Sequence, residues 1–401
     1  MTDTKGKTNS KLKRFIKQAY AYKFFNSFIL LYPLYAIMFK DHGMSDTEVS
    51  ILLIFWSIGS IIFQIPCGLI ADKYSRKNMI LLGQAMKVCC FAVWLIFPNF
   101  IGFLTGFLMW GFQWAVNNSV FEALVYEELK SFRKRKLYAK VSGRNQAIHT
   151  IGEVTSAFGS LLIFLGYDII TYLSMASVIS SFVVVLCMKP NSKRKNKPNL
   201  SYLKILRQGI NILKKEPKIF FIIVLLTTII GLAYIDEYFG LIGLEMGFNK
   251  QYVGFIFASV LIMESLGGFI AHKFEGIPDS ILYLGVIILG FIFISISLVY
   301  NIYGIIILAA FYFLYSIIKV LLFAKFQHSI KSNTRGTVLA FYSLFEQISS
   351  IGSYAVMMIA AALGSYKFGF LMLGSIVAVL GLIYTFVDTK TRNDSEENIN
   401  G

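Results

Sequence analysis

The residues of this chain with the clearest chemical potential are glutamates that interrupt long apolar runs. Glu153, Glu264 and Glu346 each lie inside a run of roughly 20 apolar residues, the length that crosses a bilayer as a helix. An ionisable side chain in the middle of a bilayer costs at least about 2.5 kcal/mol and faces the protein interior or water. A carboxylate held away from water also takes up a proton more readily. We therefore expect these acids to bind protons or a substrate.

Glu153 belongs to a polar stripe that also contains Asn145, His149, Ser156 and Ser160. Their spacing of three or four residues puts these side chains on one face of a helix. At 1.5 Å per residue, Glu153 is expected roughly 14 Å from the cytoplasmic end of that helix, close to the middle of the membrane.

The stripe is repeated in the second half of the chain. The matched pairs are Thr150 with Ser343, Glu153 with Glu346, Ser156 with Ser349, Gly159 with Gly352 and Ser160 with Ser353. We expect the two glutamates near a pseudo-twofold axis. Two interpretations stay open: both acids bind protons or substrate, or each hydrogen-bonds across an interface and only orders the packing.

Three further acids are candidates for proton or substrate binding. Glu122 lies in the cytoplasmic third of its apolar run, and Asp236 and Glu237 lie toward the outer end of theirs. Glu264 either joins the cavity or pairs with a lysine. Lys87 is expected in a packing or buried-pair role.

Aromatic residues make up 16% of the chain, and aromatic faces attract hydrophobic cations. The candidate cavity walls are Tyr22, Trp110, Trp114, Tyr234 and Tyr342.

Helices must position these side chains, because a segment inside the bilayer has to satisfy its own backbone hydrogen bonds. The chain is 56% hydrophobic and 15% charged, whereas a soluble domain is roughly 25% charged. The apolar runs lie at 20–39, 49–71, 78–97, 100–126, 145–166, 168–188, 218–243, 251–272, 280–300, 302–324, 336–363 and 366–387. The sequence therefore predicts an all-α membrane protein with twelve transmembrane helices.

The basic residues give this topology a direction. Of the 38 lysines and arginines, only Lys40, Lys250 and Lys367 fall in loops on one side of the membrane. Lys23, Lys87 and Lys319 lie within helices, and all the others fall on the opposite side. Basic loops face the cytoplasm, so both termini are expected there, in a bacterial plasma membrane. The net charge of +16 then faces anionic lipid and not nucleic acid.

The chain is organised as two halves. We expect a six-helix bundle at 1–188, a cytoplasmic linker with a basic amphipathic helix at 189–217, and a second six-helix bundle at 218–401. The end of the second run also matches the end of the eighth, since Gly68 and Ala71 correspond to Gly268 and Ala271. Two similar six-helix repeats are typical of secondary transporters.

The segment 68–77 reads Gly-Leu-Ile-Ala-Asp-Lys-Tyr-Ser-Arg-Lys. It resembles the signature of the major facilitator superfamily between helices 2 and 3, Gly-x-x-x-Asp-Arg/Lys-x-Gly-Arg-Arg/Lys. The chain departs from that signature at Ser75, where the family has glycine, and the copy in the second half has His272 in place of the aspartate. The twelve runs and the duplication extend the resemblance over nearly the whole chain, which implies the major facilitator fold.

The resemblance also implies a clasp between the two halves on the cytoplasmic side. In the family the aspartate faces the start of helix 11, here near Arg335, and the arginine pairs with an acid at the end of helix 4. The expected members of the clasp are Gly68, Asp72, Arg76, Lys77, Glu127, Glu128 and Arg144. The other interpretation is that the basic residues here only set the topology.

Catalysis is not expected. The four histidines are dispersed, and no nucleophile–base pair, metal-ligand spacing or nucleotide-binding loop is visible. The four cysteines lie in apolar runs and are interpreted as small buried hydrophobes. We therefore expect no enzyme, cofactor or metal, and a monomer whose partners are lipid, protons and a small molecule.

The leading functional prediction is a proton-coupled exporter of an amphipathic or cationic small molecule, similar to bacterial drug/proton antiporters. The family's helix-4 arginine and helix-5 proline are missing here, since Glu122 is the first charged residue of its run. The alternatives are an uptake symporter for a sugar, peptide or organic acid, and a lipid flippase.

Overall fold

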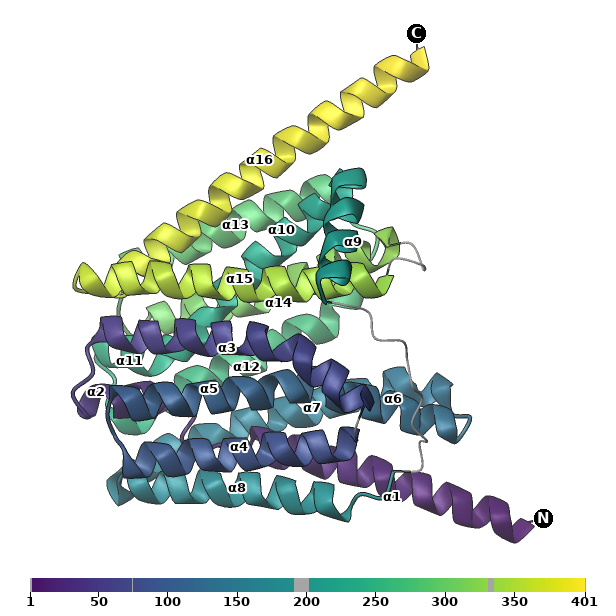
Figure 1. Cartoon of the computed structure of the whole chain (residues 1–401). Coiled ribbons are helices and arrows are strands. Elements are labelled where there is room, and N and C mark those ends of the chain that lie inside the picture. The colour runs from purple at the N-terminus through teal and green to yellow at the C-terminus, as the bar shows by residue number, and fades with distance from the viewer. Residues whose placement is uncertain (1, 74, 191–201, 331–334, 401) are drawn as a thin grey trace. The chain divides into compact units, whose positions relative to one another are not determined.

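The computed structural model (Figure 1) describes residues 2–73, 75–190, 202–330 and 335–400. Every regular element in these ranges is helical, as predicted. The chain divides into two compact units: unit 1 comprises Met1–Leu200 and Asn249–Ala258, and unit 2 comprises Ser201–Phe248 and Ser259–Gly401. Each unit is described by itself.

Most elements of unit 1 follow the predicted runs, but α1 begins well before the run 20–39 and ends inside it. Its helices are α1 (Thr2–Ser27), α2 (Tyr35–Asp41), α3 (Asp46–Lys73), α4 (Arg76–Ile96), α5 (Phe100–Val116), a π-helical turn (Asn117–Phe121), α6 (Glu122–Ser131), a 3₁₀ turn (Arg135–Leu137), α7 (Tyr138–Ser156), a 3₁₀ segment (Ala157–Leu165), α8 (Tyr167–Cys187) and a 3₁₀ turn (Lys250–Tyr252). Helix α1 lies against α7 and α8, and α4 packs on α5 and α8.

Unit 2 begins with the predicted amphipathic helix, which is α9. Its helices are α9 (Tyr202–Lys215), α10 (Pro217–Ala233), a 3₁₀ segment (Tyr234–Tyr238), α11 (Phe239–Glu245), α12 (Val253–Ile270, whose first turns belong to unit 1), a 3₁₀ turn (Ala271–Phe274), α13 (Asp279–Leu298), α14 (Gly304–Ser329), α15 (Arg335–Ala362) and α16 (Lys367–Asn400). Helix α13 packs along α16, and α10 packs against α15.

Within the described ranges, 10 helices are long and apolar enough to cross a membrane. The predicted runs 20–39 and 100–126 are absent from that set. The first is broken between α1 and α2, and the second is divided by the π-helical turn at Asn117–Phe121. These two runs are therefore interrupted within the described residues, and the runs 145–166 and 218–243 also contain 3₁₀ segments but remain among the 10 candidate spans.

The first membrane helix of each unit is broken in a similar place. Helix α1 ends at Ser27 and α2 begins at Tyr35, whereas α10 ends at Ala233 and continues as a 3₁₀ segment before α11. Pro33 lies in the first break, where its missing N–H and fixed ring disfavour a continuous helix. Discontinuous helices are a common feature of transporters near their binding sites.

Local capping explains where several helices begin. Ser75 is the N-cap of α4, and its hydroxyl accepts a hydrogen bond from the backbone N–H of Asn78 at 3.4 Å. Asn99 caps α5 in the same way through Gly102. Serine is a favoured N-cap residue, so the departure from the family glycine at position 75 gives α4 a side-chain cap.

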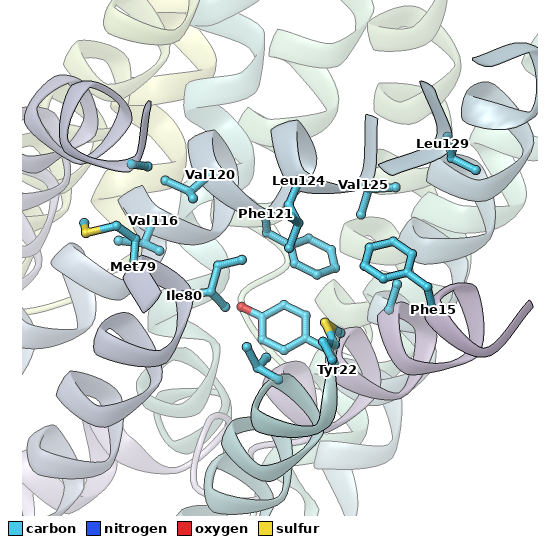
Figure 2. Packing of buried hydrophobic residues seen from close by; sticks show 14 of the residues in the cluster. Phe15, Tyr22, Met79, Ile80, Val116, Val120, Phe121, Leu124, Val125 and Leu129 are labelled. Carbon is cyan, nitrogen blue, oxygen red and sulfur yellow. The ribbon is translucent and has the colours of Figure 1, made fainter. Parts of the chain in front are cut away.

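The apolar core of unit 1 gathers around Tyr22. Figure 2 shows its ring among Phe15, Ile80 and Phe121, and the rings of Tyr22 and Phe121 lie 4.4 Å apart. Tyr22 is fully buried. This cluster joins α1, α4 and the π-helical turn, so it positions the polar groups described below.

An acid lies at the end of the broken first membrane helix in each unit, at the end of α2 in unit 1 and of α11 in unit 2. Asp41, at the end of α2, accepts hydrogen bonds from the Tyr167 hydroxyl at 2.5 Å and from Lys250. Glu245, at the end of α11, accepts from the hydroxyls of Tyr300 and Ser365. Each acid therefore contacts the start of its unit's last helix, α8 or α16.

Glu245 also accepts a hydrogen bond from the backbone N–H of Tyr366 at 3.1 Å, so one carboxylate caps the start of α16. Burial and the charge of Glu245 raise the pKa of the Tyr300 hydroxyl, which therefore stays protonated as a donor.

Glu245→Ala should lower the free energy of unfolding by about 1–2 kcal/mol, because it removes these contacts from partly exposed donors. The midpoint of thermal unfolding in detergent measures the loss. Glu275→Ala, at an exposed site in a loop, is the matched control and should leave the midpoint near that of the wild type. Equal midpoints for both variants would show that Glu245 does not hold the two helices together.

Candidate functional site

The residues of the predicted stripe on α7 form two groups that make different contacts. Ser156 is fully buried, and its hydroxyl accepts from the Ile29 N–H at 2.9 Å and donates to the Ser27 carbonyl at 3.2 Å. Gly159 lies so close to Leu30 that a Cβ would be 1.9 Å from the Leu30 carbonyl oxygen. These residues therefore pack against the break between α1 and α2, which together form the first membrane helix and are called helix 1 below.

The other members of the stripe, as far as the described residues show, do not bond to the break between α1 and α2. His149 Nδ1 lies 3.1 Å from Glu153 Oε2, and both side chains are about one quarter exposed. Asn145 is 1% exposed, and neither atom of its amide has a hydrogen-bond partner among the described residues. Ser160 donates to the backbone carbonyl of Gln251 at 2.9 Å. Glu153 and His149 are the titratable pair of this face.

A second charged pair lies between α1 and α6. Lys23 Nζ lies 3.1 Å from Glu122 Oε1 and 4.9 Å from the centre of the Phe121 ring. Glu122 directly follows the π-helical turn, and its other carboxylate oxygen is buried without a hydrogen bond in the described residues. Single π-helical turns occur frequently at functional sites. Lys23 was not among the predicted site residues.

Unit 1 also contains a buried amide network that sequence reasoning missed. Asn26 Oδ1 accepts hydrogen bonds from Gln84 at 3.0 Å and from Gln113 at 2.9 Å, and Gln84 Oε1 accepts from Ser181 at 2.7 Å. The Gln84 amide also donates to the Tyr22 hydroxyl. All five side chains are at most 5% exposed. The network therefore ties α1, α4, α5 and α8 together inside the core.

Lys87 lies at the edge of this network. Its ammonium donates to the backbone carbonyl of Asn26 at 2.8 Å and lies 4.9 Å from the centre of the Trp110 ring. Trp110 is 9% exposed and contacts the aromatic cluster of Phe91 and Trp94, whereas Trp114 packs edge-on against Trp56. Trp110 is therefore a predicted aromatic of unit 1 that faces a cation in the described part of the chain.

The acids of unit 2 are arranged around one lysine. Lys319 Nζ lies 2.6 Å from Glu264 Oε1 and 4.9 Å from the centre of the Tyr315 ring. Glu346 lies near enough to interact with the charge of Lys319, and Tyr234 hydrogen-bonds to its carboxylate. Glu264 therefore forms the direct ion pair with Lys319, and Glu346 lies within range of the same positive charge.

Tyrosines surround these acids in unit 2. Tyr342 interacts with the charge of Glu346, and its ring packs against Phe323 and Phe326. Asp236 and Glu237 lie in the 3₁₀ segment of the broken first helix, where their charges act on Tyr312 and Tyr354. The predicted acids and tyrosines of this unit thus lie in the 3₁₀ segment Tyr234–Tyr238, in α12 and in α15, and Lys319 and Tyr315 come from α14.

The predicted clasp is described only in part. Gly68 and Asp72 lie within α3, but their surroundings fall outside the described residues. Lys77 donates to the backbone carbonyls of Leu186 and Met188, both at 2.7 Å, and so caps the end of α8.

The other expected clasp residues lie near the ends of α4, α6 and α7. Arg76 is in the first turn of α4, Glu128 is 1% exposed, Arg144 is exposed, and Glu127 lies 4.0 Å from Lys130. Pairing between the clasp acids and Arg76 stays a prediction.

The arrangement of acids, lysines and tyrosines on membrane-crossing helices is that of a multi-pass transporter. The family model for the Major Facilitator Superfamily matches residues 19–353. The chain therefore belongs to the major facilitator superfamily.

Relatives of the chain are transporters of the same kind. It is 40% identical over 68 residues to the MFS-type transporter YfkF of Bacillus subtilis, and this match covers 17% of each protein. It is 26% identical over 305 residues to a transporter of Buchnera aphidicola, covering 72% of this chain and 74% of the relative. The first match thus spans only a small part of that relative.

Solved structures share the fold. An auto-inhibited peptide transporter of the POT family superposes with a TM-score of 0.74 at 13% identity, covering 94% of this chain and 96% of that one. The nucleoside transporter NupG superposes with a TM-score of 0.73 at 15% identity, covering 94% and 99%. The predicted major facilitator fold is confirmed.

Proposed function

We propose that the chain is a proton-coupled exporter of an amphipathic or cationic small molecule, with both termini in the cytoplasm. The observation that carries this proposal is the shared lysine of unit 2. Glu264 and Glu346 both interact with Lys319, so one carboxylate has no positive charge of its own when both are ionised. That surplus negative charge is offset by a proton or by a cationic substrate.

The proton and the cationic substrate compete for this surplus negative charge, and the competition explains how one is exchanged for the other. When Glu346 carries a proton, the pair of Glu264 and Lys319 is neutral. A cation that enters the site displaces the proton from Glu346, and a returning proton displaces the cation. Within unit 2, one carboxylate thus exchanges the proton for the cation, and we expect Glu153 of unit 1 to contribute a second proton-binding step. The rings of Tyr234, Tyr315 and Tyr342 supply faces for an organic cation.

The test is proton release from energised inverted vesicles that contain the full chain. Addition of ethidium, as a hydrophobic cation, should discharge a preformed pH gradient in these vesicles and not in vesicles without the protein. Accumulation of ethidium inside the vesicles should depend on the same gradient. Accumulation that continues after the gradient is collapsed would contradict proton coupling.

Glu153→Gln should weaken the same proton release by about tenfold, which corresponds to about 1.4 kcal/mol of activation free energy. Glutamine keeps the size of the side chain but cannot ionise, and His149 then loses the carboxylate at 3.1 Å. Thr155→Val, at a hydroxyl that bonds only to its own helix, is the matched control and should behave as wild type. Equal proton release in Glu153→Gln and wild type would restrict the coupling site to unit 2.

Uptake of a zwitterion such as a peptide is the alternative that one observation favours. The Lys23–Glu122 pair of unit 1 offers both charges on neighbouring groups. The solved peptide and nucleoside transporters have the same fold. Right-side-out vesicles distinguish the two directions, because an uptake symporter acidifies their interior when a dipeptide is added, and the proposed exporter does not.

A further inference from the structure

The break in helix 1 creates a helix end inside an apolar run. Helix α1 stops at Ser27, in the middle of the run 20–39, and the last four carbonyls of an α-helix have no partner within it. An unsatisfied backbone group within hydrocarbon is costly. The Phe24 and Ser27 carbonyls accept from the backbone N–H groups of Phe28 and Ile29, so the Phe25 and Asn26 carbonyls are the ones that need donors from elsewhere in unit 1.

Three neighbouring helices supply donors to three consecutive carbonyls. Ser177 of α8 donates to Phe25 at 2.8 Å, and Lys87 of α4 donates to Asn26 at 2.8 Å. Ser156 of α7 donates to Ser27 at 3.2 Å. The end of α1 is thus held from three sides, and only one of the three donors is charged.

Lys87 is placed as a cation at the negative end of a helix dipole. It is 3% exposed, and no ion pair joins it to a carboxylate among the described residues. It contacts the Asn26 carbonyl and the face of Trp110, both of which attract a positive charge, and Glu153 of α7 lies near enough for its charge to act on Lys87. A helix C-terminus carries roughly half a negative charge, which a cation stabilises.

The same end of a broken helix coordinates sodium in other transporter folds. We propose that in this protein Lys87 is a built-in cation, which caps the C-terminal end of α1 and fixes the break between Ser27 and Tyr35. Lys87 is a positioning residue, because it acts on the backbone of helix 1. This role is independent of the substrate and of the direction of transport.

The corresponding helix end in unit 2, at the end of α10, is capped differently from the end of α1. At the corresponding end of α10, the Ala233 carbonyl accepts a hydrogen bond at 2.8 Å from the neutral hydroxyl of Tyr312. The chain there continues directly as a 3₁₀ segment, whereas seven residues separate α1 from α2. The charged cap therefore accompanies the longer interruption.

The test is hydrogen exchange of backbone amides in the full chain, reconstituted in lipid nanodiscs. In Lys87→Met, amides of the peptide covering 28–34 should exchange at least about tenfold faster than in wild type, because a hydrogen bond to a charged group is lost. Lys87→Arg keeps a charged donor and should retain protection. Ser177→Ala should give a smaller increase in the same peptide. Ser180→Ala, whose hydroxyl bonds only within α8, should give none.

Two outcomes would overturn the proposal. One is wild-type exchange at 28–34 in Lys87→Met. The other is an increase that appears in α4 but not in helix 1. If Lys87→Met is not recovered as folded protein, Lys87→Arg is compared with Lys87→Gln, which keeps a donor without the charge. Equal protection in those two variants would then show that the charge has no role.

Discussion

Glu346→Gln should abolish most of the ethidium-driven proton release, with a loss of at least about tenfold, while the protein still folds. Glutamine keeps the shape of the side chain and can still accept a hydrogen bond from Tyr234, but it cannot carry or release the proton. Lys319 is then neutralised by Glu264 alone, at 2.6 Å, so the surplus negative charge of the site is gone. Release of protons from inverted vesicles measures the effect.

Two companion variants separate coupling from folding in that experiment. Glu346→Asp keeps an ionisable group one methylene shorter, and it should restore part of the proton release. Glu275→Gln changes an exposed acid of the same unit and should behave as wild type. If Glu346→Gln released protons as fast as wild type, the proton would have to bind elsewhere.

Gly159→Ala should destabilise the protein by about 3 kcal/mol, because the site is already in backbone contact. The added Cβ would lie 1.9 Å from the Leu30 carbonyl oxygen and 2.6 Å from its carbon, and neither atom can move without shifting the break in helix 1. We expect a lower midpoint of thermal unfolding and a reduced yield of folded protein.

The repeat supplies a matched control for this substitution. Gly352 aligns with Gly159, but a Cβ at Gly352 would have no neighbour within 4 Å. Gly352→Ala should therefore be neutral or stabilising by up to about 1 kcal/mol, the helix-propensity difference between the two residues. Equal losses in the two variants would show that the close approach at Leu30 does not limit stability.

The helical fold and the repeat were readable from the sequence for simple reasons. Apolar runs of membrane length report helices directly, since no other local structure satisfies the backbone in lipid. The matched glutamates of α7 and α15 were visible from three- and four-residue spacing. The family was readable from the charged motif near Asp72, because that motif depends on residue type and order alone.

The breaks inside the helices were not predicted, because their causes are tertiary. Pro33 was the single local signal for the break in helix 1. The donors that make the break tolerable, Ser156, Ser177 and Lys87, come from distant parts of the chain. The 3₁₀ segment Ala157–Leu165 carries no proline, and its aligned partner in α15 is regular α-helix.

The buried amide network was missed for a related reason. Asn26, Gln84 and Gln113 each stand alone in an apolar run, and a single amide there carries no pattern. Their significance appears only when the helices bring them together around Asn26 Oδ1. In the same way, the spacing of the α7 stripe could not show that Ser156 bonds to helix 1 while Glu153 pairs with His149.

The central claim is that Glu346 takes up and releases the transported proton. Difference infrared spectroscopy on the reconstituted protein tests it most directly, since a protonated carboxyl has its own stretching band. We expect that band to disappear when ethidium binds to wild type, and the change to be absent in Glu346→Gln and present in Glu275→Gln, the exposed control. A band that changes equally in Glu346→Gln and wild type would contradict the account.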